Sequence, residues 1–245
     1  MQGFRSDVTI TKKGVIDLVT EWDLRSEELI REELLQAFPD HAVIGEEGDS
    51  TGSGERVWYV DPIDGTTNFS QGHPFFCVSI ALYEGDTPLV GVVYAPALQT
   101  EWKGAAGLGA TRNAVPCRVS PASTLEDALV ATGFPYDRWV NPDDNLREYR
   151  AFMKCTRGVR RCGSAALDLA MTADGTYAAF WEQRLNAWDM AAGALLVQLA
   201  GGRLSDYDGS PGEPRSGRIV ATNARLHDCV LETLQSARES ETPRA

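Results

Sequence analysis

The chain of 245 residues, 43% hydrophobic and 24% charged, has the composition of an ordinary folded protein, which excludes a disordered or fibrous one. Its formal net charge of −12 argues against non-specific binding to DNA, RNA or anionic membranes, because such binding needs a basic surface. No stretch reaches the ~18 consecutive apolar residues of a membrane span, and the N-terminus lacks the apolar core of a signal peptide, so we expect a cytoplasmic protein.

The 5 cysteines are widely spaced and include no CxxC pair, which indicates neither a disulfide framework nor a zinc site. We expect reduced and mostly buried thiols at Cys77, Cys117, Cys155, Cys162 and Cys229.

The N-terminal part of the chain predicts one helix followed by strands. Asp23 is a candidate N-cap for a helix over Leu24–Phe38, whose apolar residues recur on one face, and Pro39 ends the pattern. Ala42–Gly45 is short and apolar, which is consistent with a buried strand that places Glu46 at its end.

The segment Trp58–Phe69, WYVDPIDGTTNF, runs from an apolar strand directly into a glycine turn. After it, Phe75–Tyr83 and Leu89–Tyr94 are rich in strand-forming residues and are joined by turn residues, which predicts a hairpin. Gly104–Asn113 predicts the end of another hairpin.

From Leu125 onward the pattern predicts strands and helices in alternation. The expected strands are 128–132, 177–181, 202–205 and 218–222, and the expected helices are 143–156, 164–173, 188–200 and 224–238. We therefore expect a layered α/β fold with an α+β part over residues 1–124 and an α/β part over residues 125–245.

The sequence DPIDGT can gather oxygen atoms in one corner. Asp61 and Asp64 flank a proline with a fixed φ angle, and Gly65 relaxes the steric limits of the turn, so both carboxylates and the Ile63 carbonyl can converge. Such oxygen ligands suit Mg²⁺, which keeps part of its water shell. The backbone N–H groups of Gly65 and Thr66 could then bind phosphate at the start of a helical turn.

Each acidic site also has a structural interpretation. A D-x-x-D-G segment alone is most often a solvated turn, and Glu46 and Glu47 could form a charged loop edge. Asp189 could be the N-cap of an alanine-rich helix. Three such sites in one chain favour a shared metal site over three unrelated surface features.

Five segments, in order and spacing, resemble the signature motifs of the inositol monophosphatase family. They are DLVTEWD (Asp17–Asp23), GEE (Gly45–Glu47), DPIDGTTNF (Asp61–Phe69), RRCGSAALDLA (Arg160–Ala170) and WDMAAG (Trp188–Gly193). The family belongs with the fructose-1,6-bisphosphatases among Mg²⁺-dependent, lithium-sensitive phosphatases. The resemblance implies the sugar-phosphatase fold of alternating helix and sheet layers, with the active site between the two parts.

The resemblance also implies the metal ligands. A first Mg²⁺ would be held by Glu46, Asp61 and the Ile63 carbonyl, and a second by Asp61, Asp64 and Asp189, with Asp61 bridging the two. Glu46 could in addition help to hold a weaker third ion through water.

Catalysis in the family is by water rather than by a covalent nucleophile. The match assigns Thr66 and Asp23 to the orientation and deprotonation of this water, with Glu46 as an alternative base. Gly65 and Thr66 would bind phosphate oxygens through their backbone N–H groups.

The substrate is less constrained than the chemistry. The positions that match the family's contacts to the alcohol are Asp64, Gly163, Ser164, Ala165 and Glu182. Glu182 can accept hydrogen bonds from ring hydroxyls, which favours a polyol such as inositol 1-phosphate. Fructose 1,6-bisphosphate and histidinol phosphate remain alternatives on this scaffold. Arg184 could contact a second phosphate or lie on a dimer surface.

The resemblance also implies a homodimer. Members of the family usually carry a helix ahead of the Lys12 region, and this sequence begins almost at that region, so we expect either a true start further upstream or a protein without this helix. The rival class is a non-catalytic protein whose acidic cluster binds a divalent cation for stability.

Overall fold

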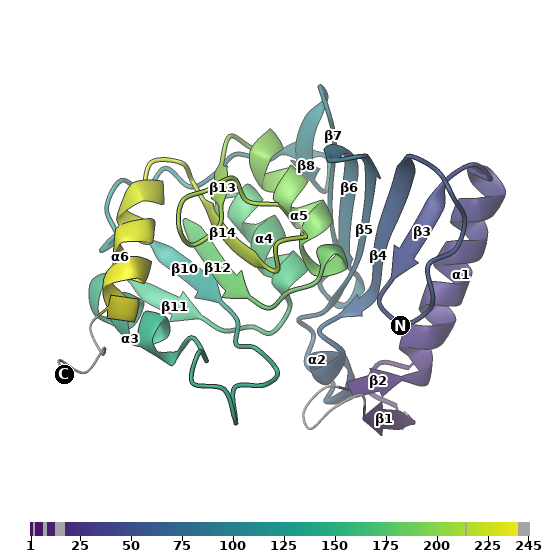
Figure 1. The fold of residues 1–245 in the computed structure, drawn as a ribbon, viewed down its shortest axis with the longest axis horizontal. Coiled ribbons are helices and arrows are strands. Elements are labelled where there is room, and N and C mark those ends of the chain that lie inside the picture. The colour runs from purple at the N-terminus through teal and green to yellow at the C-terminus, as the bar shows by residue number, and fades with distance from the viewer. Residues whose placement is uncertain (2, 7–8, 13–17, 214, 240–245) are drawn as a thin grey trace.

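The structure is a computed structural model, and it describes all residues except 2, 7–8, 13–17, 214 and 240–245. Figure 1 shows five layers, in which two sheets alternate with helices. One outer layer holds α3 (Leu146–Cys155) and α6 (His227–Glu239), the central layer holds α4 (Ala165–Ala173) and α5 (Ala187–Leu199), and α1 (Glu21–Ala37) covers the other side. The predicted alternation of helix and sheet layers is confirmed.

The larger sheet has seven strands, which follow one another in chain order. They are β3 (Ala42–Gly45), β4 (Arg56–Asp64), β5 (Cys77–Glu84), β6 (Thr87–Ala95), β7 (Thr100–Ala105), β8 (Gly109–Arg112) and β9 (Val115–Pro116). The short 3₁₀ turn η1 (Pro96–Leu98) joins β6 to β7. β3 and β4 are parallel, and the other neighbours are antiparallel, so both expected hairpins are confirmed.

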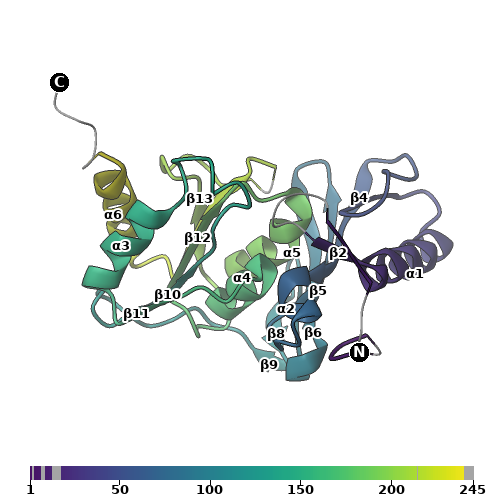
Figure 2. The same cartoon turned by 90° about the horizontal axis from the view of Figure 1, so that it is seen from below.

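The smaller sheet has five strands, of which β11, β10 and β12 are parallel and β14 and β13 complete it in antiparallel pairs. The strands are β10 (Leu129–Thr132), β11 (Gly158–Arg160), β12 (Ala179–Gln183), β13 (Arg203–Ser205) and β14 (Arg218–Thr222). A separate pair, β1 (Ile10–Lys12) and β2 (Leu18–Thr20), lies beside the short helix α2 (Thr66–Ser70) in Figure 1. In Figure 2, seen from below, α4 and α5 lie between the two larger sheets.

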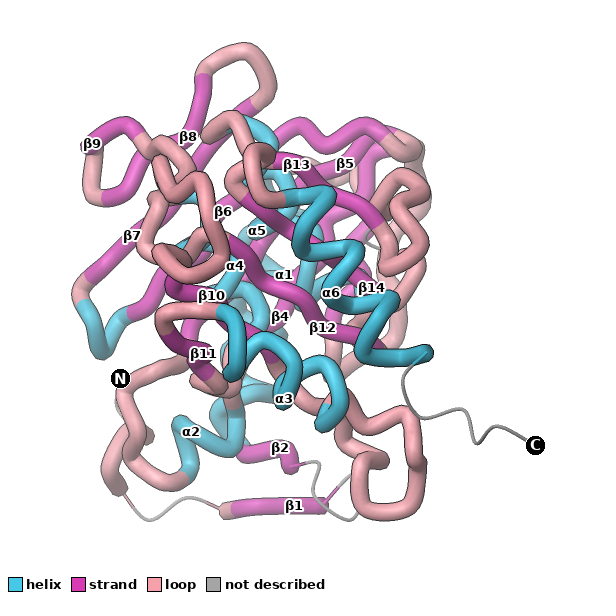
Figure 3. Tube along the Cα trace, turned by 90° about the vertical axis from the view of Figure 1, so that its left-hand side faces the viewer, coloured by secondary structure: helices cyan, strands magenta, loops and turns pink. Residues whose placement is uncertain are grey.

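The main core lies between the two sheets, where α4 and α5 are buried. Leu167 and Leu169 of α4 and Met190 and Leu196 of α5 are fully buried, as expected for helices that are apolar on all sides. A second core lies under α3 and α6, which cross the outer face of the smaller sheet in Figure 3. Because α4 and α5 both contact strands of the two sheets, their positions are fixed relative to both.

Several predicted boundaries are wrong for local reasons. Asp23 is not the N-cap of α1: that residue is Thr20, and Asp23 lies three positions inside the helix, where its side chain accepts from the Thr20 backbone N–H. α6 begins at His227 because Ala224 has a φ of 67°, outside the helical region. Strand β11 was not predicted, since its three residues are too short to show a pattern.

All five cysteines are free, and Cys77 and Cys117 are the buried ones. Within the described part of the chain, no helix is both long enough and apolar enough to cross a membrane.

Candidate active site

A cavity of about 130 Å³ lies where the end of β4 and α2 meet the N-terminal ends of α4 and α5. The predicted site residues that line it are Glu46, Asp61, Ile63, Asp64, Gly65, Thr66, Gly163, Ser164, Ala165, Glu182 and Asp189. Asp23 is not part of the lining and contacts the Thr66 hydroxyl from behind. The structure thus brings together side chains that are far apart in the sequence.

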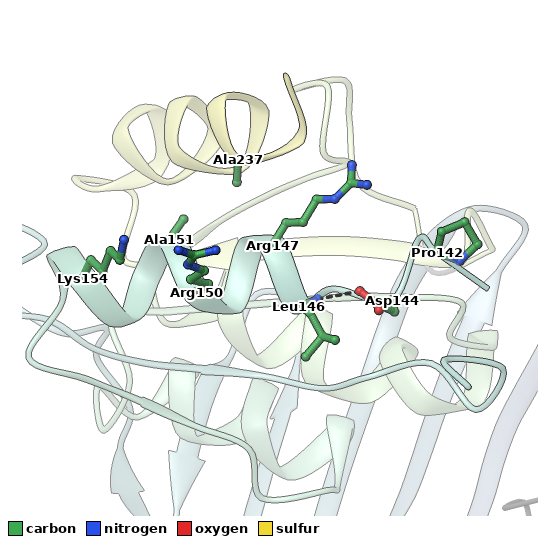
Figure 4. A pocket seen from close by; sticks show the side chains of 8 residues that line it. All are labelled: Pro142, Asp144, Leu146, Arg147, Arg150, Ala151, Lys154 and Ala237. Carbon is green, nitrogen blue, oxygen red and sulfur yellow. Dashed lines mark hydrogen bonds between the residues drawn. The ribbon is translucent and has the colours of Figure 1, made fainter. Parts of the chain in front are cut away.

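A larger hollow, of about 660 Å³, lies elsewhere, between α3 and α6 (Figure 4). Its lining includes Arg147, Arg150 and Lys154, and Asp144 is the single carboxylate among the residues that line it. The Asp144 carboxylate accepts a hydrogen bond from the Leu146 backbone N–H at the start of α3. This basic hollow lacks the converging oxygen ligands that a hard cation needs.

The corner after β4 is shaped by the DPID segment. The pairing of β4 with β5 shifts register between Asp61 and Asp64, which is where the chain leaves the regular ladder. Asp61 is buried, and one of its carboxylate oxygens, Oδ1, accepts a hydrogen bond of 3.0 Å from the Ile63 backbone N–H. Gly65 has a φ of 98° and could not carry a side chain without strain. Two aspartates and the start of α2 are therefore held in one tight turn.

Asp64 joins this corner to α4. Its Oδ2 accepts hydrogen bonds from the Ser164 hydroxyl (2.7 Å) and from the Ala166 backbone N–H (2.6 Å) at the helix N-terminus. Burial raises the pKa of Asp64 to about 6, and these hydrogen bonds limit the rise. One oxygen of Asp64 thus fixes the two segments together, and Oδ1 takes neither of these hydrogen bonds.

Asp189 is held in the same manner at the start of α5. It is the third residue of a capping box, in which its Oδ2 accepts from the Asn186 backbone N–H at 2.6 Å. The structural interpretation of Asp189 as the N-cap is therefore wrong, because Asn186 occupies that position. In each of Asp61, Asp64 and Asp189, the hydrogen bonds described above involve one carboxylate oxygen only, and the other oxygen could serve as a ligand.

The carboxylates of the cavity repel one another. Burial, and then the charges of Glu46, Asp64 and Asp189, raise the pKa of Asp61 well above its ordinary value. Burial and the Asp64 charge likewise raise the pKa of Asp189. A divalent cation at this place would convert the repulsion into attraction, so the donor set fits Mg²⁺.

The cavity does not contain a complete protein cage for a metal. Among the described residues, no three His, Cys, Asp or Glu side chains are close enough together to hold one ion. Mg²⁺ tolerates this because it keeps several waters and needs only one or two carboxylates in addition to carbonyl and substrate oxygens.

Thr66 and Asp23 form a buried hydrogen-bonded pair beside the aspartates. The Thr66 hydroxyl lies 3.0 Å from Asp23 Oδ1 and 3.1 Å from the Ile63 carbonyl oxygen. Asp23 Oδ2 accepts from the backbone N–H and the hydroxyl of Thr20, at 2.8 and 2.5 Å. Because the hydroxyl proton of Thr66 is directed to these acceptors, its oxygen can accept a hydrogen bond from a third group in the cavity.

Glu182 approaches the cavity from β12. It packs closely against Gly133, since a Cβ atom on that residue would lie 1.9 Å from Glu182 Oε1. Burial raises the pKa of Glu182 to about 8, although the positive charge of Arg161 opposes this rise. The tight contact explains why a glycine precedes the loop that follows β10.

Some residues of the site were not predicted from the sequence. Phe134, Tyr136 and Arg161 line the cavity together with Arg184, which was considered only as a contact for a second phosphate or as a surface residue. Asp168 of α4 is buried nearby, and its Oδ1 has no hydrogen bond within the described part of the chain. The repeated arginines before the CGSAA segment were the only available signal.

The chain matches the model of the inositol monophosphatase family over residues 1–239. It is 45% identical to an inositol-1-monophosphatase of Synechocystis sp. over 220 residues, which cover 89% of this chain and 77% of that protein. It is 46% identical to the Nus factor SuhB of Pseudomonas aeruginosa, with 93% of this chain and 86% of that protein covered.

This chain belongs to the inositol monophosphatase family. An inositol monophosphatase structure from Anabaena superposes with a TM-score of 0.85 at 44% identity, covering 87% of this chain and 86% of that one. The structure of the inositol monophosphatase from Thermotoga maritima gives a TM-score of 0.89 at 35% identity, with coverages of 98% and 91%. As a member of the inositol monophosphatase family, the chain is a phosphomonoesterase.

Proposed function

We propose that this protein hydrolyses small phosphate monoesters with Mg²⁺, and that inositol 1-phosphate is its main substrate. The observation that supports this function is the Thr66–Asp23 pair beside the repelling aspartates of one cavity. A site that only binds a cation for stability needs the carboxylates, but it does not need the Thr66 hydroxyl that is hydrogen-bonded to Asp23.

The metal ligands are proposed as the sequence implies. Glu46, Asp61 and the Ile63 carbonyl would hold one Mg²⁺, and Asp61, Asp64 and Asp189 a second. Glu46 could in addition help to hold a third ion through water. In both Asp64 and Asp189 the hydrogen bonds described above involve Oδ2, which supports the use of Oδ1 as the ligand atom. Because no three acidic side chains of the described residues lie close enough together to hold one ion, the second set requires these carboxylates to move together when the ion binds. When bound, the ions lower the pKa of water and stabilise the leaving oxygen of the ester.

The chain's own residues move the proton and bind the phosphate. Thr66 accepts the proton of the attacking water through its hydroxyl oxygen and passes its own proton to Asp23, with Glu46 as the alternative base. The backbone N–H groups of Gly65 and Thr66, at the start of α2, hold the phosphate oxygens. No cysteine or histidine takes part.

The alcohol part of the substrate would lie towards α4 and β12. Gly163, Ser164, Ala165 and Asp64 form one side of this subsite and Glu182 the other, so that the reaction takes place between the 1–124 and 125–245 parts of the chain. A carboxyl group with a pKa near 8 can both donate and accept a hydrogen bond near neutral pH, which suits the hydroxyls of a polyol ring.

The direct test is phosphate release from inositol 1-phosphate, fructose 1,6-bisphosphate and histidinol phosphate, with and without Mg²⁺. We expect turnover only with the metal and the highest kcat/KM for inositol 1-phosphate, together with inhibition by Li⁺. A protein that gains thermal stability from Mg²⁺ and hydrolyses no ester would instead be a non-catalytic metal-binding protein.

We also propose a homodimer in the cytoplasm, as the family resemblance implies. Light scattering of the purified protein should give twice the mass of 26.7 kDa that the sequence predicts for one chain.

A further inference from the structure

Helix α1 contains a buried carboxylate that no step of the proposed reaction uses. Glu27 is only 3% exposed, whereas the other glutamates around it on the helix, Glu28, Glu32 and Glu33, are exposed. Burying a charged group is costly unless hydrogen bonds or an opposite charge compensate for it. Glu27 does not line the cavity, and its hydrogen-bond partners lie in the segment that follows β3.

Glu27 binds the backbone directly beyond a proposed metal ligand. The Glu47 N–H donates to Glu27 Oε2 and the Gly48 N–H donates to Glu27 Oε1, each at 2.8 Å. The preceding residue, Glu46, lines the cavity, and its own N–H donates to the Val60 carbonyl oxygen of β4 at 3.2 Å. Three consecutive N–H groups are therefore held, one by β4 and two by Glu27.

Two glycines make room for the Glu27 carboxylate. A Cβ atom on Gly45 would lie 2.3 Å from Glu27 Cδ, and a Cβ atom on Gly48 would lie 3.0 Å from Glu27 Oε1. Neither glycine is among those with a positive φ, so the reason for glycine is space rather than backbone conformation. The Gly45–Gly48 segment is thus shaped around this carboxylate.

Arg31, one turn later on α1, balances the buried charge. Its Nη2 lies 2.5 Å from Glu27 Oε1, and its Nη1 donates to the Asp49 carbonyl oxygen and to the Thr51 hydroxyl, at 2.6 Å each. The side chains of Glu27 and Arg31 are only 4% and 15% exposed, so solvent screens this pair little. The two side chains together hold the chain after Glu46 against α1.

This anchoring opposes the repulsion within the acidic cavity. Glu46 lines the same cavity as Asp61 and Asp64, and like charges in one cavity repel. Without a bound cation, a loosely held segment would relieve the repulsion by moving Glu46 outwards. Hydrogen bonds to a charged group are stronger than neutral ones, so the two bonds to Glu27 resist this movement.

We propose that Glu27 is a positioning residue for the first Mg²⁺. Through the N–H groups of Glu47 and Gly48 it fixes the backbone on which Glu46 reaches the cavity, and Arg31 supports it. The inference rests on the proposed role of Glu46 as a metal ligand. It gives a part of α1 that is outside the cavity a defined effect on metal affinity.

The first test is Glu27→Gln, which replaces one acceptor oxygen by an N–H donor, so that one of the two backbone N–H groups loses its partner. We expect hydrogen exchange at the Glu47 and Gly48 amides of the metal-free protein, followed by NMR, to be about tenfold faster. The calorimetric Kd for Mg²⁺ should rise about tenfold. The matched control is Glu28→Gln, which removes the same charge from the exposed neighbour and should change both quantities less than about twofold.

A double-mutant cycle with Glu46→Gln shows whether Glu27 acts through Glu46. In the Glu46→Gln background the ligand is already lost, so Glu27→Gln should raise the Kd for Mg²⁺ by less than about twofold. Excess Mg²⁺ should restore most of the phosphate release by Glu27→Gln, because its Glu46 is displaced and not removed. Equal effects of Glu27→Gln in both backgrounds, or a rate that stays low at saturating Mg²⁺, would overturn the positioning role.

Arg31→Met tests the same network if Glu27→Gln does not fold. It removes the bonds to Glu27 and Asp49 but leaves Glu27 with its two backbone partners, so amide exchange and Kd should rise by about threefold. Unchanged exchange and Kd would overturn the inference, as would a wild type that binds no Mg²⁺. A wild type that binds Mg²⁺ but hydrolyses no ester would refute the proposed function alone, since exchange and binding still decide the role of Glu27.

Discussion

At the scale of single residues, the aspartates of the cavity combine a structural and a chemical task on separate oxygens. Asp64 Oδ2 holds the N-terminus of α4, and Asp189 Oδ2 caps α5. The geometry of the free oxygens is therefore set before any ligand binds, which is the preorganisation that a catalytic site needs.

Replacing Asp189 by asparagine separates its hydrogen bond at the start of α5 from its proposed role as a metal ligand. In Asp189→Asn the amide oxygen can still accept from the Asn186 N–H, so the helix cap remains while the charge is lost. We expect Mg²⁺ affinity to fall and kcat/KM to drop by more than about 100-fold, because metal catalysis supplies several kcal/mol. The metal-free protein should melt at a higher temperature, since one repelling charge is gone.

Calorimetric Mg²⁺ binding, phosphate release and thermal melting check these three results. The control is Asp40→Asn, which removes the same charge from an exposed residue away from the cavity. Full activity and unchanged affinity in Asp189→Asn would show that the two-ion assignment is wrong.

Thr66 allows a test of proton transfer apart from metal binding. Thr66→Val keeps the shape of the side chain but removes the hydroxyl that is bonded to Asp23. We expect kcat to fall about 100-fold, as is typical for the loss of general base catalysis, while Mg²⁺ affinity stays the same. Thr66→Ser restores the hydroxyl and should restore most of the rate. A slow Thr66→Ser variant or an active Thr66→Val variant would contradict the assigned role.

At the scale of elements, the positions of α4 and α5 depend on one close contact. A Cβ atom on Gly193 of α5 would lie 2.4 Å from Leu169 Cβ of α4, so only glycine lets the helices approach this closely. Because Asp189 lies one turn earlier on α5, the same contact determines where this carboxylate reaches the cavity.

Gly193→Ala should therefore affect both stability and the site. We expect a loss of about 1–3 kcal/mol in the free energy of unfolding from overpacking, and a weaker Mg²⁺ affinity because α5 is displaced. Denaturant unfolding and calorimetry measure the two effects. Adding Leu169→Gly removes the Cβ atom that the new methyl group would meet, so the double variant should regain Mg²⁺ affinity relative to Gly193→Ala. Unchanged affinity in the single variant would contradict this coupling.

Much of the element order could be predicted from the sequence, because long apolar patterns such as those of α5 and β4 give clear signals. The start of α1 could not be predicted, since Thr20 and Asp23 are both residue types that cap helices. In the folded chain Thr20 is the N-cap, and the Asp23 carboxylate accepts a hydrogen bond from the Thr66 hydroxyl. The place of Arg161 in the cavity was also hidden, because Phe134, whose ring lies 5.9 Å from Arg161 Cζ, is distant from it in the sequence.

At the scale of the whole molecule, the buried carboxyl groups determine how stability depends on pH. Burial raises the pKa of Glu182 to about 8 and that of Asp168 well above its ordinary value. The folded chain thus binds more protons than the unfolded chain, so its stability falls as pH rises through this range. His227 has the opposite effect on stability. Burial lowers its pKa to about 4, so the folded chain binds fewer protons at this residue than the unfolded chain. Its contribution to stability is therefore lost only as the pH falls below its ordinary pKa of 6.5.

We therefore expect the melting temperature of the metal-free protein to fall between about pH 6.5 and pH 8.5, where only the raised carboxyl groups contribute. Mg²⁺ should stabilise the protein more at the upper end of this range, because its ligands must lose their protons to bind it. Differential scanning calorimetry with and without Mg²⁺ measures both trends. In Asp61→Asn the melting temperature should depend less on pH, because one carboxyl group with a raised pKa is gone. A melting temperature that rises with pH in the metal-free wild type would contradict the raised pKa values of the buried carboxyl groups.

The central position of α4 and α5 has a consequence for the order in which the protein is made. A ribosome releases the whole seven-stranded sheet before it has synthesised either helix, because β9 ends at Pro116 and α4 begins at Ala165. During that interval the face of the sheet that carries Tyr83 and Trp102 has no cover, although both are buried in the finished core. The nascent chain therefore exposes an apolar surface until α5 emerges, and this is the stage at which a chaperone would protect it from aggregation.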